Sequence, residues 1–425
     1  MEYFFSVLSN AQLVAPQLFL CLAALITINA RNISGYPLPY ISVFLAYFTL
    51  GPVLNWAMNA DLYVGTVESQ IPSVAWWYTL CLWVWAIIYL LWLWIFPARH
   101  IPTRLATADN TGRTKNYWGL ELLNLIASAW AALVIARTLA AGATDKLEAI
   151  SQAGNFHYSY LLLEVVLSSA AILTWHGTGF SLATWINLAT YTGYCLVTFE
   201  RDFIFVFFAL FIHIAASKSA RFRLLIPMLG ILAIIIATSI FVLRSPDQEF
   251  GISTVLGQGS NLFVDTFLLE GLTSGSFPPI ESYWAAIFRQ QPTEYGNLTN
   301  WLVYQWAGGA DGSGYGFSLI GEAYMNGGRL AIVILFAVLA FVSLGLFRAA
   351  DRSPLALMLS VAYTTAIMYA IRGELATLIS TMLAALIIGV GASFASRESR
   401  KDVPPPGQQG CRAPQSAQGI TPEPQ

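Results

Sequence analysis

The sequence predicts an all-α polytopic membrane protein with about 11 transmembrane helices and one long extracytoplasmic loop. Two observations predict this class. Of the 425 residues, 56% are hydrophobic and only 10% are charged, whereas about a quarter of the residues in a soluble globular domain are charged. The apolar residues also fall into runs of about twenty, the length that an α-helix needs to cross the hydrocarbon of a bilayer.

The apolar runs follow one another closely except at one long interruption. They lie near residues 13–30, 38–58, 74–96, 119–140, 158–175, 179–198, 203–217, 225–243, 327–347, 355–371 and 375–395. The run at 203–217 is short, and Pro52 and Pro227 fall inside two others, so the expected number of spans carries a margin of one or two. Residues 1–395 are therefore expected to form a single transmembrane domain.

The distribution of basic residues predicts how the chain is oriented. Lys and Arg favour the cytoplasmic side of a membrane protein, and most of the 21 basic residues fall on the side that carries the C-terminus. The C-terminus is then cytoplasmic, and the long loop at 244–326 is periplasmic or extracellular. Residues 396–425 are rich in Pro, Gln and Gly, so we expect a disordered cytoplasmic tail.

Composition also argues against several functional classes. The net charge of −2 gives no reason to expect a nucleic-acid partner. The four Cys and four His residues are scattered without ligand-type spacing, so we expect no metal site. The sequence lacks the lysine-containing P-loop of nucleotide-binding proteins and the DxD motif of transferases that use nucleotide sugars. We therefore expect no cofactor and no nucleotide-sugar donor.

Charged side chains at the outer ends of spans are costly to place near hydrocarbon, and each is a candidate for function. They occur in four places: Glu200-Arg201-Asp202; Arg289; Glu322, with Tyr324, Asn326 and Arg329 after it; and Arg372-Gly373-Glu374 between the last two spans. Arg201, Arg289 and Arg372 could converge in the fold and form a clamp for a pyrophosphate group. Each guanidinium can donate two parallel hydrogen bonds to phosphate oxygens. Alternatively, each pairs locally, Arg201 with Glu200 or Asp202 and Arg372 with Glu374.

Glu322 is the strongest candidate carboxylate in the chain. It lies four residues before Asn326, so the two side chains share a face if the segment is helical. A carboxylate half buried near Leu319 and Ile320 is suited to act as a general base on a sugar hydroxyl. The alternative is a helix-start carboxylate that interacts with the helix dipole. Gly327-Gly328 would then allow a neighbouring helix to approach this segment closely, or would interrupt the helix.

Several segments together resemble the Wzy-type O-antigen polymerases, which polymerise lipid-linked oligosaccharide repeat units. They are GFSLIGEAYMNGG at 316–328, ESYWAAIFRQQP at 281–292, the ERD triplet at 200–202, IRGEL at 371–375 and YPLPYISVFLAYFTLG at 36–51. The related O-antigen ligases usually carry a histidine in their large outer loop. The long loop of this chain contains none, so the resemblance favours a polymerase over a ligase. The resemblance implies a GT-C-like polymerase–ligase architecture in the bacterial inner membrane.

The resemblance also implies a chemistry. A glycan on undecaprenyl pyrophosphate would be the donor, a hydroxyl of a second lipid-linked unit the acceptor, and a chain-length regulator a further partner. It assigns Glu322, Arg372 and Arg289 to catalysis, with Glu322 as the general base or as the residue that positions the acceptor. It assigns the following residues to substrate binding: Arg201, Arg244, Tyr283, Tyr324, Asn326, Arg329 and Glu374. The product would be O-antigen for lipopolysaccharide, capsule or exopolysaccharide.

Two other readings stay open from the residues alone. A transporter or flippase of polar or lipid-linked saccharides would show repeat symmetry and charges near the middle of spans. In this chain most charges fall at the ends of the apolar runs, which favours an enzyme. A related ligase would use the same kind of donor but a different acceptor.

Overall fold

The fold is all-helical in the part of the chain that the structure, a computed structural model, describes. The described residues are 16, 17, 19, 20, 38–58, 62, 65–96, 118–142, 165–167, 169–171, 180–198, single positions between 204 and 239, 251–256, 261–278, 280–288, 290–307, 316–350 and 353–395. These residues contain no strand, only an isolated bridge between Thr293 and Gly296. The all-α prediction is confirmed for this part of the chain.

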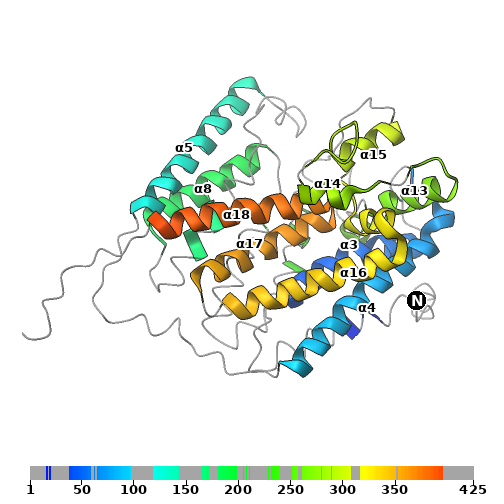
Figure 1. Cartoon of the computed structure of the whole chain (residues 1–425). Coiled ribbons are helices and arrows are strands. Elements are labelled where there is room, and N and C mark those ends of the chain that lie inside the picture. Colours follow the sequence, from blue (N-terminus) through cyan, green and yellow to red (C-terminus); the bar gives the residue numbers. More distant parts are fainter. Residues whose placement is uncertain are drawn as a thin grey trace, which may run out of the picture.

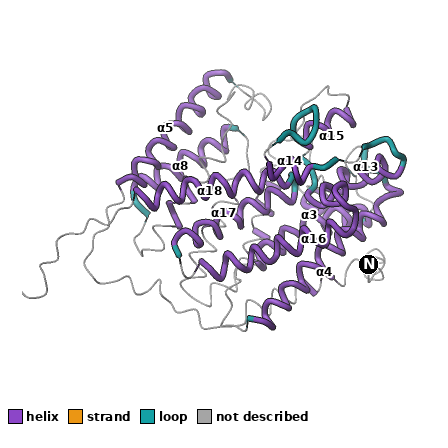
Figure 2. Tube along the Cα trace, in the orientation of Figure 1, coloured by secondary structure: helices purple, strands orange, loops and turns teal. Residues whose placement is uncertain are grey.

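Long apolar helices account for most of the described residues (Figure 2). They are α3 (Leu38–Ala57), α4 (Ile71–Ile95), α5 (Trp118–Ala141), α8 (Leu182–Val197), α16 (Leu319–Ala350), α17 (Pro354–Ile371) and α18 (Leu375–Ala395). Four described segments are long and apolar enough to cross a bilayer: Glu68–Trp92, Trp118–Ala141, Leu319–Ala350 and Pro354–Ile371. The chain is thus a membrane protein, and the expected total of eleven spans stays a prediction.

A bundle of adjacent helices forms the main core. Figure 1 shows α4, α16, α17 and α18 side by side, with α3 behind them, and α5 packed on α8 at one edge. Large aromatic side chains fill the centre of this bundle. They include Trp77 and Trp85 of α4, Phe336 of α16 and Tyr363 of α17, all nearly inaccessible. Helices this apolar around their whole circumference pack a core on one side and meet lipid on the other.

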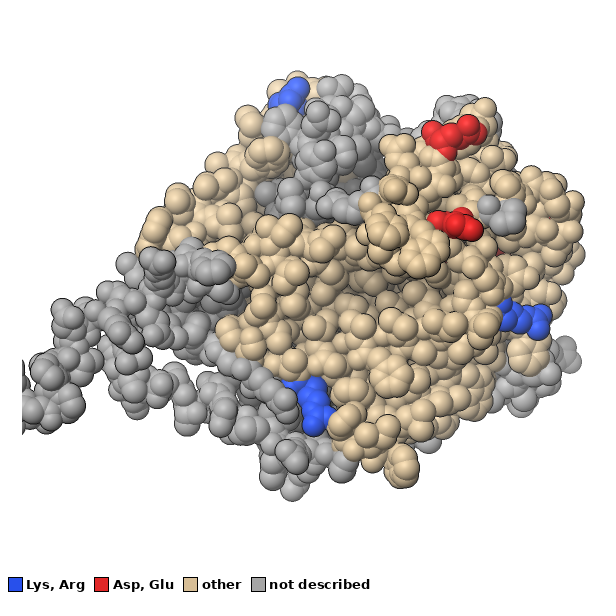
Figure 3. All heavy atoms as spheres, viewed as in Figure 1, with Lys and Arg blue, Asp and Glu red and all other residues tan. Residues whose placement is uncertain are grey.

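The outer surface of the bundle is apolar. Helix α5 exposes Leu122, Leu125, Trp130 and Leu133, which are suited to contact with hydrocarbon rather than water. In the described part of the face seen in Figure 3, charged side chains are few and lie toward its margins. This distribution is the one expected of helices that cross a membrane.

Four helices lie within the expected long loop. They are α12 (Ile252–Leu256), α13 (Asn261–Thr273), α14 (Ser282–Phe288) and α15 (Leu298–Ala307). Helices α13, α14 and α15 gather at the end of the bundle where α4, α16 and α18 begin and α17 ends (Figure 1). The loop is therefore a helical cap on one end of the bundle, and the candidate site lies where the cap meets the bundle.

Helix α16 also begins inside the expected loop. Its first residue is Leu319, whereas the sequence predicted a span near 327–347. The helix is interrupted at Gly327 and Gly328, and Gly328 has a φ of 62°, a backbone conformation that favours glycine. The break separates a first segment, which carries Glu322 and Asn326, from the longer segment that continues through the bundle.

Candidate functional site

Glu322 lies at the junction of three helices. Its side chain is 1% exposed. One carboxylate oxygen accepts a hydrogen bond from the hydroxyl of Ser282, the first residue of α14, at 2.7 Å. The other accepts from the backbone N–H of Leu375, the first residue of α18, at 2.6 Å. A single carboxylate of α16 therefore fixes the start of a cap helix and the start of a bundle helix.

Asn326 extends this arrangement by one helical turn. Its amide nitrogen donates to the carbonyl of Glu322 and to the hydroxyl of Ser282, both at 2.8 Å. Its amide oxygen accepts from the backbone N–H of Tyr283 at 3.1 Å. Glu322 and Asn326 thus share one face of a helix, as their spacing predicted. We call Glu322, Asn326, Ser282 and the N–H of Leu375 the Glu322 network.

The turn between α17 and α18 carries the next pair of predicted residues. Glu374 is 9% exposed, and one of its oxygens accepts from the backbone N–H of Leu298, the first residue of α15, at 2.9 Å. Burial raises the pKa of Glu374, and the Leu298 N–H opposes this rise. The guanidinium carbon of Arg372 lies 5.4 Å from the centre of the Phe48 ring of α3, within the range of a cation–π contact.

The backbone at the end of α17 is held from outside the helix. The side-chain amide of Asn261, at the start of α13, donates to the carbonyl of Ile371 at 2.9 Å. The backbone N–H of Phe317 donates to the carbonyl of Arg372 at 3.2 Å. Two of the carbonyls that a helix end leaves without intrahelical partners are thereby satisfied.

A third buried carboxylate, Asp265, lies in α13 and is fully inaccessible. It accepts a hydrogen bond from the Tyr78 hydroxyl of α4 at 2.8 Å. Its other oxygen lies beside Gly321, where an added Cβ would sit 2.5 Å from it. Burial raises the pKa of Asp265 to about 7, and the hydrogen bond from Tyr78 opposes this rise. Gly321 therefore leaves the space that lets α13 pack against the start of α16.

Helices α13, α14 and α15 each have a contact to the bundle through a buried carboxylate. Asp265 attaches α13, Glu322 attaches α14 and Glu374 attaches α15. A buried carboxyl group that lost its hydrogen-bond partners would be strongly destabilising. Together with the hydrogen bonds from Asn261 of α13 to the Ile371 carbonyl and from the Tyr283 N–H of α14 to Asn326, these contacts tie the cap to the bundle at several separate points.

The predicted tyrosines lie next to the Glu322 network. Tyr324 stacks on Trp77 of α4, with ring centres 4.0 Å apart and planes 21° from parallel. Tyr283 is partly buried, and its hydroxyl meets no hydrogen-bond partner in the part of the chain that is described. Burial and the nearby Glu322 carboxylate raise the pKa of Tyr283. Both side chains are partly buried and pack against the main hydrophobic core.

The predicted arginines are only partly placed. Arg372 lies at the cap end of the bundle, and Arg329 is exposed just after the break in α16. Arg201, Arg244 and Arg289 lie outside the described residues, so the convergence of three arginines stays a prediction. The described His, Cys, Asp and Glu residues form no group of three that could hold a metal ion.

Sequence reasoning did not find Asp265, Ser282 or Asn261 as site residues. Asp265 had a usable signal, because it is a lone acidic residue within the apolar run NLFVDTFLL. Ser282 falls within ESYWAAIFRQQP, a segment that the family resemblance had already marked. Asn261 had no local signal, because its partner is a carbonyl 110 residues later in the chain.

The C-terminal part of the site can be compared with known families. Residues 280–394 match the family model of the O-antigen polysaccharide polymerase Wzy. The match confirms the resemblance to Wzy predicted from the sequence. It begins just before α14, ends within α18 and contains the whole Glu322 network, Arg372 and Glu374. Asp265 precedes it. Comparisons with curated proteins and with solved structures find no significant match.

Proposed function

We propose that the chain joins oligosaccharide repeat units carried on undecaprenyl pyrophosphate, on the outer face of the bacterial inner membrane. The observation that carries this proposal is the Wzy match over 280–394, because that segment holds both the Glu322 network and Arg372. The apolar bundle supports it further, since a donor with a polyprenyl tail needs a site next to lipid.

The reaction is a glycosyl transfer. The oxygen of an acceptor sugar hydroxyl bonds to the anomeric carbon of the donor glycan. The bond between that carbon and the pyrophosphate oxygen breaks, the lipid pyrophosphate leaves, and the hydroxyl proton is released to water. Transfer of the glycan from pyrophosphate, a good leaving group, to a sugar hydroxyl is favourable in free energy, so the protein has to supply positioning and charge stabilisation.

Arg372 is the residue that we assign to the leaving group. It lies at the end of α17 where the cap meets the bundle, and a guanidinium can form paired hydrogen bonds to pyrophosphate oxygens. Arg289, Arg201 and Arg244 are proposed to assist it. Tyr283, Tyr324, Asn326, Arg329 and Glu374 are proposed to line the glycan site, as the resemblance implies.

For Glu322 we favour the acceptor-positioning role over that of general base. Both of its oxygens accept hydrogen bonds from the chain itself, and the side chain is 1% exposed. A base needs a lone pair that faces its substrate. Glu322 instead holds α14, α16 and α18 together, so it positions the residues that meet the acceptor.

The proposal is tested with purified protein in liposomes and a lipid-linked repeat unit from cells that lack this chain. Wild-type protein should yield a ladder of polymers on a gel. Arg372→Ala should leave single units, with a loss of roughly 100-fold or more in rate, the effect of removing one charge-stabilising group. Arg348→Ala is the matched control. Arg348 lies in the last turn of α16, away from the cap, and its guanidinium contacts the ring of Phe96.

Two results would contradict the proposal. Ladders of normal length and rate from Arg372→Ala at equal protein levels would remove Arg372 from the reaction. Movement of the lipid-linked unit across the bilayer without any joining would instead identify a flippase.

A further inference from the structure

Helix α14 has two faces of different character. Ser282, Ala285 and Ala286 are buried against the bundle. Trp284, Ile287 and Phe288 are 61%, 53% and 65% exposed, although all three are large and apolar. Their spacing of three and four residues places them on one side of the helix. An exposed cluster of this kind marks a surface that another apolar phase covers.

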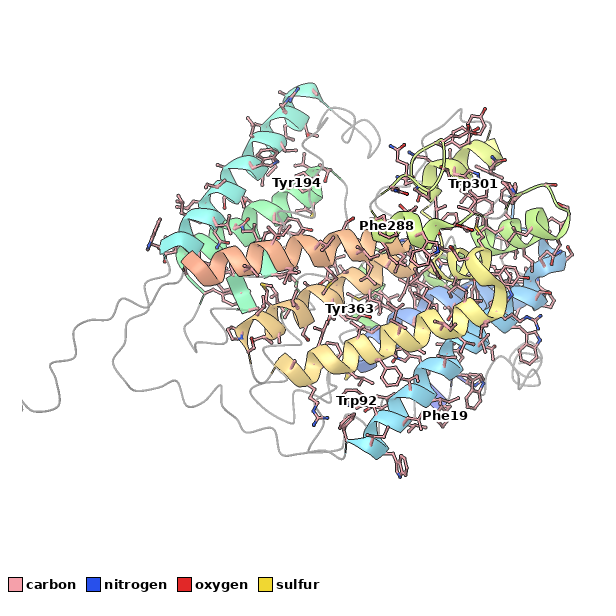
Figure 4. All side chains as sticks on the ribbon, viewed as in Figure 1. Phe19, Trp92, Tyr194, Phe288, Trp301 and Tyr363 are labelled. Carbon is pink, nitrogen blue, oxygen red and sulfur yellow. The ribbon has the colours of Figure 1, made fainter. Side chains whose placement is uncertain are left out.

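The position of α14 relative to the bundle identifies that phase. The first residue of α14 and the first residue of α18 bind the same carboxylate, that of Glu322. An apolar stretch of α18, Leu375–Gly391, begins at that point, and α14 runs in contact with α18. Figure 4 labels Phe288 on α14, close to the start of α18. The start of α14 therefore lies beside the start of this apolar stretch.

Polar residues flank the apolar cluster in the chain. Glu281 precedes α14, and Gln290 and Gln291 follow it, all three exposed. The backbone N–H of Gln290 donates to the carbonyl of Ala285 at 2.8 Å, which ends the helix in a turn. Trp284 and Phe288 stack with ring centres 6.1 Å apart. A short helix with an aromatic face and polar ends is suited to the boundary between headgroups and acyl chains.

We infer that α14 lies in the membrane interface, with Trp284, Ile287 and Phe288 in contact with bilayer lipid. The helix then has lipid on one side and Ser282 and Tyr283 of the candidate site on the other. This inference concerns lipid contact alone, so it stands or falls separately from the polymerase assignment.

Photo-crosslinking of the full-length protein tests this inference. The photoreactive residue p-benzoylphenylalanine is placed at 284, 287 or 288, one position per variant, and the protein is reconstituted in vesicles of phosphatidylethanolamine and phosphatidylglycerol. Irradiation followed by intact-mass measurement should show lipid adducts at each position. Position 387 in α18, 70% exposed on an apolar helix, is the positive control. Positions 281 and 291, on the polar flanks of α14, should give at least several-fold less adduct.

Three outcomes would overturn the inference. The first is adduct formation at 387 but not at 284, 287 or 288. The second is equal lipid labelling at 281 and 288, which would show that labelling does not follow the apolar face. The third is a crosslinked dimer at 288 in place of a lipid adduct, which would assign this face to a second copy of the chain. Folding of each variant is checked by size-exclusion chromatography. If the variant at one of the three positions does not fold, the other two still test the inference.

Discussion

At the scale of single residues, Gly321 determines how closely α13 approaches α16. A Cβ at this position would lie 2.5 Å from an oxygen of Asp265 and 2.7 Å from a methyl carbon of Leu268. Gly321→Ala should therefore lower the free energy of unfolding by about 1–3 kcal/mol, the usual cost of overpacking. Thermal unfolding in detergent measures the change.

Gly345 of the same helix provides the control for this substitution. A Cβ there meets nothing within 4 Å, so Gly345→Ala should be neutral or stabilise the helix by up to about 1 kcal/mol. Equal melting temperatures for the two alanine variants would show that the contact between Gly321 and Asp265 is not tight.

The protonation of Asp265 gives a pH-dependent prediction. Its pKa in the folded protein, about 7, is above the ordinary value of 3.8, so folding favours the protonated form. Its contribution to stability is thus fully present below pH 3.8 and is lost as the pH rises through 7. The groups that face it are Tyr78 and Cys81 of α4, and Ser318 and Gly321 beside the start of α16.

The measurement compares wild type with Asp265→Asn, which cannot ionise. From about pH 5 to about pH 8 the wild type should lose on the order of 2 kcal/mol of stability relative to the variant. Over the same pH range, the melting temperature of the wild type should fall relative to that of the variant. A difference that is constant over this range would mean that Asp265 does not titrate there.

Residues could be predicted from the sequence where their contacts are local. Glu322 and Asn326 are four residues apart, and helical geometry alone places them on one face. Asp265 and Tyr78 are 187 residues apart, and nothing in either local sequence indicates that they meet. The role of Glu322 as a bridge between helices was also unpredictable, because one of its donors is a backbone N–H.

At the scale of elements, the break in α16 makes its own prediction. Gly328 has a φ of 62° and a ψ of −150°, a combination that is costly for any residue with a Cβ. Gly328→Ala should cost roughly 1–3 kcal/mol of stability, measured by thermal unfolding in detergent. Gly391→Ala in α18, where a Cβ meets nothing within 4 Å, is the control and should have little effect. Equal loss in both variants would contradict the assigned conformation at Gly328.

The long helices were predictable and the cap helices were not. Apolar runs of about twenty residues identified α3, α4, α5, α17 and α18 within a few residues of their bounds. Helices α13, α14 and α15 are short and separated by Gly, Pro and Ser, which are typical of loops. Their helical state depends on packing against the bundle, which no single-segment pattern reports.

At the scale of the whole molecule, the three buried carboxylates predict that the cap opens in separate parts. Glu374→Ala removes the acceptor of the Leu298 N–H, so backbone amides in the first turn of α15 should exchange with solvent about 10-fold faster. Glu322→Ala should accelerate exchange in α14 and in the first turn of α18 instead. Hydrogen exchange read by mass spectrometry distinguishes these patterns. Uniform acceleration across the whole cap in both variants would show that it opens as one unit.

The attachment of the last turn of α17 also limits how Arg372 can move. The Asn261 side chain donates a hydrogen bond to the carbonyl of Ile371, and the backbone N–H of Phe317 donates one to the carbonyl of Arg372 itself. Displacement of the main chain there would break hydrogen bonds to two distant segments. Any reach toward a bound anion must come from torsions about the side chain's own bonds. A lysine at 372 would start from the same fixed Cα but would present only a single ammonium group. It would restore the charge but not the paired hydrogen bonds that a guanidinium can donate to the anion.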